Sequence, residues 1–286
     1  MNRLLKLLKK INLSISNPIP QDQKYEIGFL VLWVGTKCTL RCRDCGNLIP
    51  YVAPASFDMD QIISDMNTLL SFCRVNKLQI QGGEPFTNPK IGKLIDRIDN
   101  FNIPEIVITT NGTIRLNQQI IKSLKNVKNS NFQMVLSSYE CARNKQDEFY
   151  SVLVSNHINC LKYDFYQKDG SWVNQGGPET CRNNDDQKTQ ELYSQCAFKI
   201  CLSLVNGELF RCGRAKVSSE VFGLQYDSND YLNIRKIGDA AEGLSEIVKF
   251  LNNPHFKEYC RYCLGTEEKI PPAIQLSAAS KAVIGK

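Results

Sequence analysis

Histidine is scarce in this sequence, because only His157 and His255 occur among its 286 residues. A zinc site or an acid–base site built on histidine is therefore not expected. No long basic run appears either, although the net charge is +6. We therefore expect no nucleic-acid partner. The first residues lack the long apolar core and the small-residue cleavage site of a secretory signal, which indicates a cytoplasmic protein.

Cysteine, in contrast, is abundant. Twelve cysteines stand at positions 38, 42, 45, 73, 141, 160, 181, 196, 201, 212, 260 and 263. An even number would suggest disulfides in a secreted protein, but this chain shows no secretory signal and clusters several cysteines at the spacing of metal ligands. The sequence therefore predicts cysteine–metal chemistry in a reducing compartment.

Three of these cysteines, Cys38, Cys42 and Cys45, directly follow an apolar segment over residues 29–34 that we predict to be a buried strand. Three soft thiolates on one loop suit a cubane iron–sulfur cluster and leave one iron open for a ligand. A zinc loop or three unrelated buried cysteines would give the same pattern. The triplet alone therefore leaves these interpretations open.

Strand, loop and helix alternate about five times between residues 29 and 165. The segments expected to be strands are 29–34, 78–81, 105–110, 133–136 and 159–165. The segments expected to be helices are 58–73, with Ser56 as N-cap, 91–98, 117–126 and 143–154. This pattern predicts an α/β domain with a parallel sheet, whose functional loops lie at the carboxyl ends of the strands.

Glycine-rich and polar motifs stand where those functional loops are expected. Gly82-Gly83-Glu84-Pro85 follows the second strand, Thr110-Asn111-Gly112 ends the third, and Ser137-Ser138 ends the fourth. Glycines let a ligand approach the backbone closely. Each motif alone would be an ordinary turn, but their order after the cysteine triplet points to one shared site.

Over about residues 28–165, the triplet and these motifs resemble the radical SAM superfamily. The resemblance implies a partial (β/α)6 TIM-like barrel. It also implies that Cys38, Cys42 and Cys45 hold a [4Fe–4S] cluster whose open iron binds S-adenosylmethionine (SAM), which an electron cleaves to a 5′-deoxyadenosyl radical. The SAM-binding residues that it implies are Gly82, Gly83, Glu84, Asn111 and Ser137.

One position departs from that family. The residue before the third cysteine is usually aromatic and lies near the adenine, but here it is Asp44. A carboxylate does not stack on adenine in the same way. We therefore expect the adenine contact to come from the backbone around Asp44 or from Tyr139.

The second half of the chain loses the alternation of strands and helices. Residues 166–195 are polar, and we expect a long loop there. Asn206-Gly207 lies between two short apolar segments, which is a strong signal for a β-hairpin. A helix is expected over residues 244–251.

Cysteine spacing in this half resembles the twitch or SPASM-type extension of some radical SAM enzymes. In that signature a cysteine stands nine to fifteen residues before Gly-x4-Cys, and Cys-x2-Cys follows. Ten residues separate Cys196 from Gly207, whereas five separate Cys201 from it. The resemblance therefore implies an auxiliary [4Fe–4S] cluster on Cys196, Cys212, Cys260 and Cys263. Four thiolates in two pairs would also suit a structural zinc ion.

Five cysteines belong to neither set. Cys73, Cys160 and Cys201 are expected in the core. Cys141 and Cys181 are candidate hydrogen-atom donors to a substrate radical, as in some radical epimerases. A plain buried or surface thiol is the simpler interpretation of these two residues.

We expect four regions along the chain. They are an N-terminal helix and connector over residues 1–25, a radical SAM core over 26–166, a twitch-like auxiliary domain over 167–270 and a C-terminal tail over 271–286. Residues 1–11 combine an apolar helical face with basic residues. We expect this helix to dock on its own domain rather than to contact an anionic membrane.

Together these features predict an oxidoreductase that uses SAM and two [4Fe–4S] clusters. The expected substrate is a sugar, an aminocyclitol or a similar polar metabolite, as for the aminocyclitol dehydrogenases that share the short twitch architecture, and the auxiliary cluster would accept an electron. A flavodoxin- or ferredoxin-like protein is the expected electron donor. The alternatives are a peptide-modifying enzyme, an epimerase, an activating enzyme for a glycyl-radical partner and a non-catalytic zinc-binding module.

Overall fold

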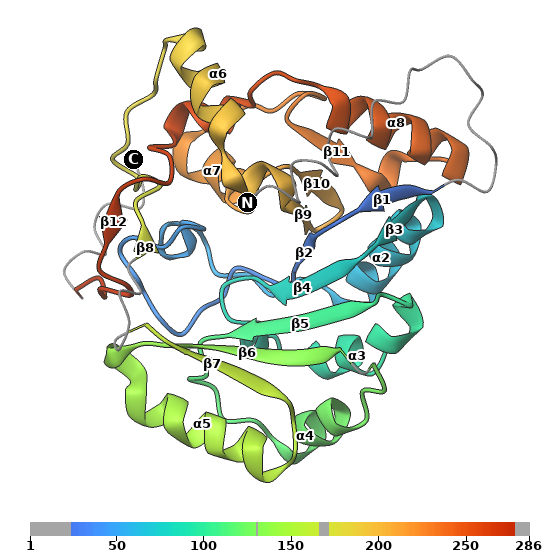
Figure 1. Ribbon diagram of the computed structural model, residues 1–286, viewed down its shortest axis with the longest axis vertical. Helices are drawn as coiled ribbons and strands as arrows, with labels where there is room; N and C mark the ends of the chain where they lie inside the picture. The colour runs from blue at the N-terminus through green and yellow to red at the C-terminus, as the bar shows by residue number, and fades with distance from the viewer. Residues whose placement is uncertain (1–23, 130, 166–171, 278–286) are drawn as a thin grey trace, which may run out of the picture.

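A central sheet organises the part of the chain that the computed structural model describes, which comprises residues 24–129, 131–165 and 172–277 (Figure 1). Within these ranges the sheet has eight strands, in the order β11 (Tyr231–Asn233), β10 (Glu208–Phe210), β9 (Leu202–Val205), β2 (Leu30–Trp33), β4 (Lys77–Gln81), β5 (Glu105–Thr110), β6 (Phe132–Ser138) and β7 (Cys160–Asp164). Strands β2, β4, β5, β6 and β7 pair in parallel, so the predicted α/β core is confirmed. The helix expected over residues 1–11 lies outside the described residues.

Helices connect the parallel strands and pack on one face of the sheet. They are α2 (Met59–Phe72), α3 (Ile91–Ile95), α4 (Gln118–Lys125) and α5 (Arg143–Ser155). The expected N-cap of α2 at Ser56 is wrong, because Ser56 pairs with Gly35 in a β-bridge. Asp58 caps the helix instead, since its carboxylate accepts a hydrogen bond from the Gln61 backbone N–H at 2.9 Å.

The predicted β-hairpin of the second half is confirmed as β9 and β10. Asn206 and Gly207 turn the chain with φ of 50° and 82°, the left-handed values that a tight hairpin turn requires. Strand β9 also pairs in parallel with β2, so the hairpin continues the sheet of the first half. The division into a core over 26–166 and an auxiliary domain over 167–270 stays a prediction.

Further helices and short strands complete the second half. They are β8 (Trp172–Val173), α6 (Asp186–Gln195), α7 (Ala215–Phe222), α8 (Ala240–Asn252) and β12 (Lys269–Ile270). The expectation of one loop over 166–195 is therefore wrong for α6. Only Thr189 and Tyr193 of α6 are buried, so the helix shows almost no apolar periodicity. The Asp185 carboxylate caps it by accepting from the Lys188 backbone N–H at 3.0 Å.

Smaller elements fill the edges of the fold. Strand β3 (Cys73–Val75) begins where α2 ends and pairs with β1 (Tyr25–Ile27). Short 3-10 helices lie at Ile49–Tyr51, Pro85–Thr87, Ile98–Phe101, Glu140–Ala142, Ala197–Ile200, Ile234–Lys236 and Glu258–Tyr262. In the described part of the chain, no helix combines the length and the apolar character needed to cross a membrane.

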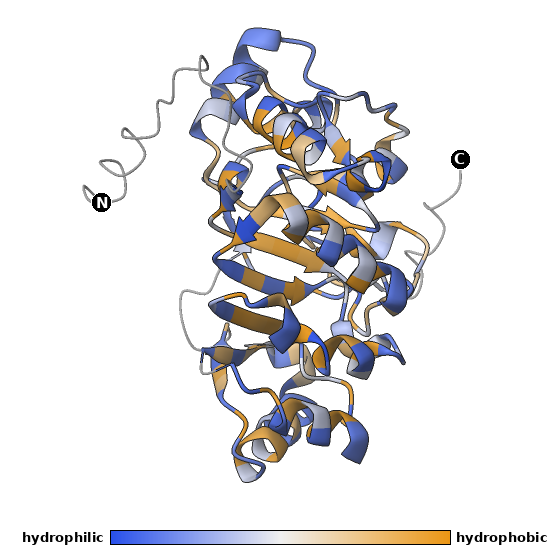
Figure 2. Cartoon of the chain, turned by 90° about the vertical axis from the view of Figure 1, so that its right-hand side faces the viewer, coloured by the Kyte–Doolittle hydropathy of each residue, from blue (hydrophilic) through white to orange (hydrophobic). Residues whose placement is uncertain are grey.

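The two faces of the sheet are both buried, as expected for parallel strands. On β2, Leu30 and Leu32 pack toward the helices of the first half, whereas Val31 and Trp33 pack toward α7 and the C-terminal segments. Hydrophobic residues accordingly recur along the central strands in Figure 2. The second face leaves a pocket at the carboxyl ends of the strands, where the predicted motifs meet.

Candidate functional site

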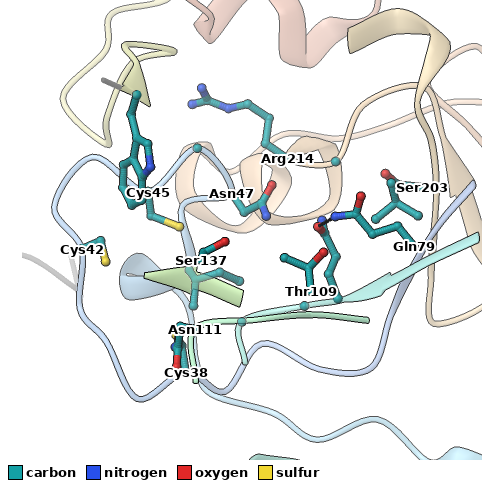
Figure 3. A pocket seen from close by; sticks show the side chains of 18 of the residues that line it. Cys38, Cys42, Cys45, Asn47, Gln79, Thr109, Asn111, Ser137, Ser203 and Arg214 are labelled. Carbon is teal, nitrogen blue, oxygen red and sulfur yellow. Dashed lines mark hydrogen bonds between the residues drawn. The ribbon is translucent and has the colours of Figure 1, made fainter. Parts of the chain in front are cut away.

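A pocket of about 380 Å³ lies beside the carboxyl ends of the parallel strands, and we refer to it as the central pocket. It brings together Cys38, Cys42 and Cys45, which we call the first cysteine site. Figure 3 shows the three cysteines on one side of the pocket and the side chains of Gln79 and Ser203 on the opposite side. The predicted meeting of the strand-end motifs at one site is therefore observed.

Burial keeps the first cysteine site in its thiol form until a metal displaces the protons. It raises the pKa of Cys38 to about 11 and that of Cys42 to about 12, and it also raises the pKa of Cys45. Two side-chain amides donate to the sulfurs: Asn111 Nδ2 lies 3.5 Å from Cys38 Sγ, and Gln275 Nε2 lies 3.3 Å from Cys42 Sγ. Soft sulfur ligands with N–H donors are the environment of an iron–sulfur cluster, so the site fits a three-thiolate cluster.

The paired glycines bring the loop after β4 against the loop after β2. The Gly83 backbone N–H donates to Gly35 O at 3.1 Å. A Cβ on Gly82 would lie 2.4 Å from Gly35 O, and a Cβ on Gly83 would lie 2.2 Å from Lys37 O. Backbone therefore packs directly on backbone here, which only glycine permits. Both glycines also line the central pocket.

Glu84 has a different position from the two glycines, because its side chain points away from the pocket. It is 2% exposed, and its carboxylate accepts from the Asn111 backbone N–H at 2.7 Å and from the Thr110 hydroxyl at 2.8 Å. Burial raises the pKa of Glu84 to about 7, although these donors oppose the shift. The Glu84 side chain thus joins the loop after β4 to the end of β5.

Asn111 and Ser137 both line the central pocket, and their role in binding SAM stays a prediction. A residue that the sequence analysis missed, Gln146 of α5, holds their loops together. It is fully buried, and its amide donates to Asn111 O at 2.7 Å and to Ser137 O at 3.2 Å. A lone glutamine on the buried face of a helix is the one signal that could have identified it.

Aromatic side chains line the central pocket, although Asp44 does not supply one. Asp44 forms an ion pair with Arg43 at 2.8 Å and does not line the central pocket. Tyr139 and Trp172 do line it, with their ring centroids 5.5 Å apart in an edge-on arrangement, and Phe165 stacks on Tyr139 at 5.3 Å. Tyr139 thus offers the aromatic surface for which the sequence analysis proposed it.

The C-terminal segment near Gln275 runs beside the first cysteine site, although we expected only a tail there. Cys42 and Gln275 form an antiparallel bridge, and the Arg43 backbone N–H donates to Ile274 O at 2.7 Å. Gln275 Oε1 accepts from the Arg41 backbone N–H at 2.8 Å. The segment therefore closes one side of the cysteine loop, and no local pattern in the sequence announced it.

The other cysteines divide differently from the prediction. Cys141 and Cys181 are exposed, and neither lines the central pocket. Cys201 was expected in the core but is half-buried and lines the pocket, because β9 begins one residue later. Cys73 is buried in the core, and Cys160 packs against it, as predicted.

The second cysteine site comprises the predicted auxiliary set, Cys196, Cys212, Cys260 and Cys263, each of which is half-buried. Burial raises the pKa of Cys212 to about 12, and that of Cys260 is raised by burial and then by the neighbouring cysteines. The Gly265 backbone N–H lies 3.4 Å from Cys263 Sγ. Among the described residues, the buried hydroxyls of nearby Tyr193 and Tyr259 have no hydrogen-bond partner. Four soft ligands with such donors fit a cluster.

A single metal ion would require a tighter group of ligands. Among the residues that the structure describes, no three histidine, cysteine, aspartate or glutamate side chains are arranged to hold one ion. Zinc also accepts four thiolates, so metal analysis is the measurement that separates the two assignments.

The chain is similar to a known protein family in sequence and to solved structures in fold. Residues 34–143 match the family described as the Radical SAM superfamily. A search of curated proteins gave no match. The structure is similar to that of BtrN in complex with AdoMet and 2-DOIA, with a TM-score of 0.55 and 13% identity over 89% of this chain and 100% of that chain. At this identity the similarity concerns the fold.

A more distant similarity exists to Streptococcus suis SuiB bound to S-adenosylmethionine. The TM-score is 0.41 and the identity 18%, over 56% of this chain and 36% of that chain. Across three SuiB structures, the chain spans 36%, 42% and 43% of the SuiB length.

Proposed function

We propose that this chain is a radical SAM enzyme, as the family match over residues 34–143 supports, and that it oxidises a sugar, an aminocyclitol or a similar polar metabolite by removing a hydrogen atom. Cys38, Cys42 and Cys45 would hold the cluster that binds SAM. When bound, the cluster and SAM supply the electron and the 5′-deoxyadenosyl radical that takes the hydrogen atom. We propose a flavodoxin- or ferredoxin-like protein as the electron donor.

In this proposal the residues around the central pocket position SAM beside the first cysteine site. Gly82 and Gly83 expose backbone groups to the pocket, and Asn111 and Ser137 add polar groups at its edge. Glu84 and Gln146 hold these loops in register through their buried hydrogen bonds. Tyr139 is our candidate for the adenine contact.

The polar wall opposite the cysteines is the observation that carries the substrate class. Gln79, Thr109 and Ser203 line it with neutral hydrogen-bonding groups. The Ser203 hydroxyl is fully buried and has no partner in the described part of the chain. Since a buried hydroxyl without a partner is costly, we infer that a substrate hydroxyl or carbonyl completes its hydrogen bonding.

Charge around the pocket supports a neutral substrate. Arg214 is the one charged residue among those described that line it, and its guanidinium donates to the backbone carbonyls of Gln175 and Gly176. Among the described residues, no carboxylate lines the pocket to receive a substrate ammonium group, which favours a sugar over an aminocyclitol. Hydroxyl-rich, uncharged parts of a metabolite therefore match this wall best.

The second cysteine site would hold the auxiliary cluster. Each of the four thiolates would bind one iron, which would leave no iron open to the substrate. This cluster would therefore supply an electron acceptor rather than a binding site for the substrate. Cys212 belongs to this site and also lines the central pocket. This position supports a short path between the pocket and the second site.

The proposal is tested with the full chain, loaded anaerobically with iron and sulfide. Two cubane clusters require about eight iron atoms and eight sulfides per chain. With SAM and dithionite, carbon-deuterated sugars and aminocyclitols should transfer deuterium to 5′-deoxyadenosine. Deuterium transfer only from peptides would replace the proposed substrate class with peptides. A colourless zinc protein without SAM cleavage would exclude the proposed chemistry altogether.

A further inference from the structure

Three polar side chains near the second cysteine site are buried without a hydrogen-bond partner among the described residues. They are the Lys257 ammonium group and the hydroxyls of Tyr193 and Tyr259. Lys257 is 0% exposed and Tyr259 is 4% exposed. Buried donors normally find an acceptor, so three that do not, in one region, require an explanation.

Two similar turns place these donors beside cysteines. The Cys196 backbone N–H donates to Tyr193 O at 3.2 Å, and the Cys260 backbone N–H donates to Lys257 O at 2.8 Å. In each turn the donor side chain therefore stands three residues before a cysteine of the second site. Tyr259 directly precedes Cys260.

Direct contacts hold the two turns together. The Gln190 side-chain amide donates to Pro254 O at 3.0 Å and accepts from the Phe256 backbone N–H at 2.9 Å. Arg261 adds an ion pair to Asp186 at 2.6 Å. Helix α6 and the segment 254–261 therefore pack against each other, and the three donors belong to these two segments.

Among the described residues, no carboxylate forms an ion pair with the Lys257 ammonium, although Asp230 and Asp227 lie close enough to act on it electrostatically. The carboxylate of Asp230 is engaged with backbone N–H groups, those of Glu258 at 2.7 Å and Asp227 at 3.3 Å. The Lys257 ammonium lies over the Phe250 ring, 5.5 Å from its centroid. Burial accordingly lowers the pKa of Lys257. A buried cation without a counter-charge is expensive, so an anion is expected beside it.

We propose that Lys257, Tyr193 and Tyr259 donate hydrogen bonds to the anionic group that the four cysteines of the second site would hold, and thereby make it a better electron acceptor. This inference rests on the auxiliary cluster of the proposed function. Uptake of one electron adds one negative charge and breaks no bond. A buried cation and two hydroxyls stabilise that added charge, and hydrogen bonds to cluster sulfurs raise the reduction potential.

The test compares Lys257→Met, Tyr193→Phe and Tyr259→Phe in the full chain loaded with iron and sulfide. The midpoint potential of each cluster is followed by electron paramagnetic resonance during a redox titration. We expect the second-site potential to become more negative, by about tenfold in the reduction equilibrium for Lys257→Met, which is 59 mV for one electron. The first-site potential should not change.

Two controls make the outcome decisive. Lys249→Met removes an exposed lysine of α8, and it should leave both potentials unchanged. The phenylalanine variants delete only an oxygen atom, so they test the idea even where Lys257→Met does not fold. About eight iron atoms with unchanged potentials in all three variants would overturn this inference alone. About four iron atoms in the wild type would remove the auxiliary cluster, and this inference with it.

Discussion

The two cysteine sites differ in how the protein surrounds sulfur. At the first site, the amides of Asn111 and Gln275 already donate to Cys38 and Cys42, and the pocket side stays open to a ligand. At the second site, four cysteines stand beside buried donors that have no partner within the described ranges of the chain. Under the proposed function, the first site would receive SAM and the second would stabilise the charge of an accepted electron.

The two sites also differ in the sequence separation between the cysteines and the side chains that are expected to donate to them. Cys42 and Gln275 are 233 residues apart in the sequence, so the first site depends on contacts made late in the chain. The donors of the second site stand within three residues of its cysteines. Local turns therefore set the spacing of each donor from its cysteine, whereas contacts between α6 and the segment 254–261 bring the two turns together.

The largest expected effect separates the two sites directly. Cys45→Ala should lower SAM cleavage at least about 10³-fold, because two thiolates are left for the first cluster. Cys263→Ala should still allow SAM cleavage to 5′-deoxyadenosine but should block oxidation of the substrate. The two products are measured in the same anaerobic assay. Cys181→Ser, at an exposed cysteine outside the pocket, is the control. If both alanine variants lost SAM cleavage equally, the proposed division of roles between the two cysteine sites would be wrong.

Short-range patterns predicted much of this architecture. Cysteine spacing along one loop, paired glycines and Asn206-Gly207 act over a few residues, so their geometry follows from the local sequence. The structure accordingly brings the first three cysteines to one pocket and forms the hairpin. Cys201 was assigned to the core, but it lies just before β9 and lines the pocket, as Ser203 within β9 also does.

Contacts between distant segments were not predictable in the same way. Gln275 and Gln146 act through single hydrogen bonds to segments elsewhere in the chain, and no periodicity marks such contacts. Helix α6 was missed because it is mostly exposed, so its sequence has no apolar face to detect. Tertiary packing, rather than local sequence preference, determines the positions of Gln275, Gln146 and helix α6.

A pH experiment sharpens the comparison at the first site. Burial raises the pKa of Glu84 from 4.5 to about 7, so the folded protein holds this proton more tightly than the unfolded chain. Its contribution to stability is complete below pH 4.5 and is lost as the pH rises through 7. Relative to Glu84→Gln, the wild type should lose up to about 3 kcal/mol between pH 5 and pH 8.

Urea denaturation of the metal-free protein across this range measures the difference. Glu26→Gln is the matched control, since Glu26 is exposed and its ion pair with Arg74 lies at the surface. Its difference from the wild type should stay constant between pH 5 and pH 8. A constant difference for Glu84→Gln would show that the hydrogen bonds from Thr110 and Asn111, rather than burial, set the state of this carboxyl group.

Removing Gln275 should have a smaller effect, confined to the first site. Gln275→Ala deletes the N–H donor to Cys42 and the acceptor for the Arg41 backbone N–H. We expect SAM cleavage to fall about tenfold, because partners of metal ligands typically contribute 10–100-fold. The first-site reduction potential should become more negative, while the second-site potential should not move. Gln187→Ala, on exposed α6, is the control, and a shift at both sites would contradict a local role.

The smallest expected effect concerns the polar wall of the central pocket opposite the first cysteine site. Ser203→Ala removes a buried hydroxyl that has no hydrogen-bond partner in the described part of the chain, so no hydrogen bond within that part is lost. A substrate that uses this hydroxyl loses about 1 kcal/mol, and KM should rise about fivefold. Ser218→Ala deletes an equally buried and unpartnered hydroxyl that does not line the central pocket. Both variants remove a buried hydroxyl without a described partner. A difference between them in KM therefore reports contact of Ser203 with the substrate. If KM for the deuterated substrate changes equally in both, Ser203 does not contact the substrate and the pocket wall has a purely structural role.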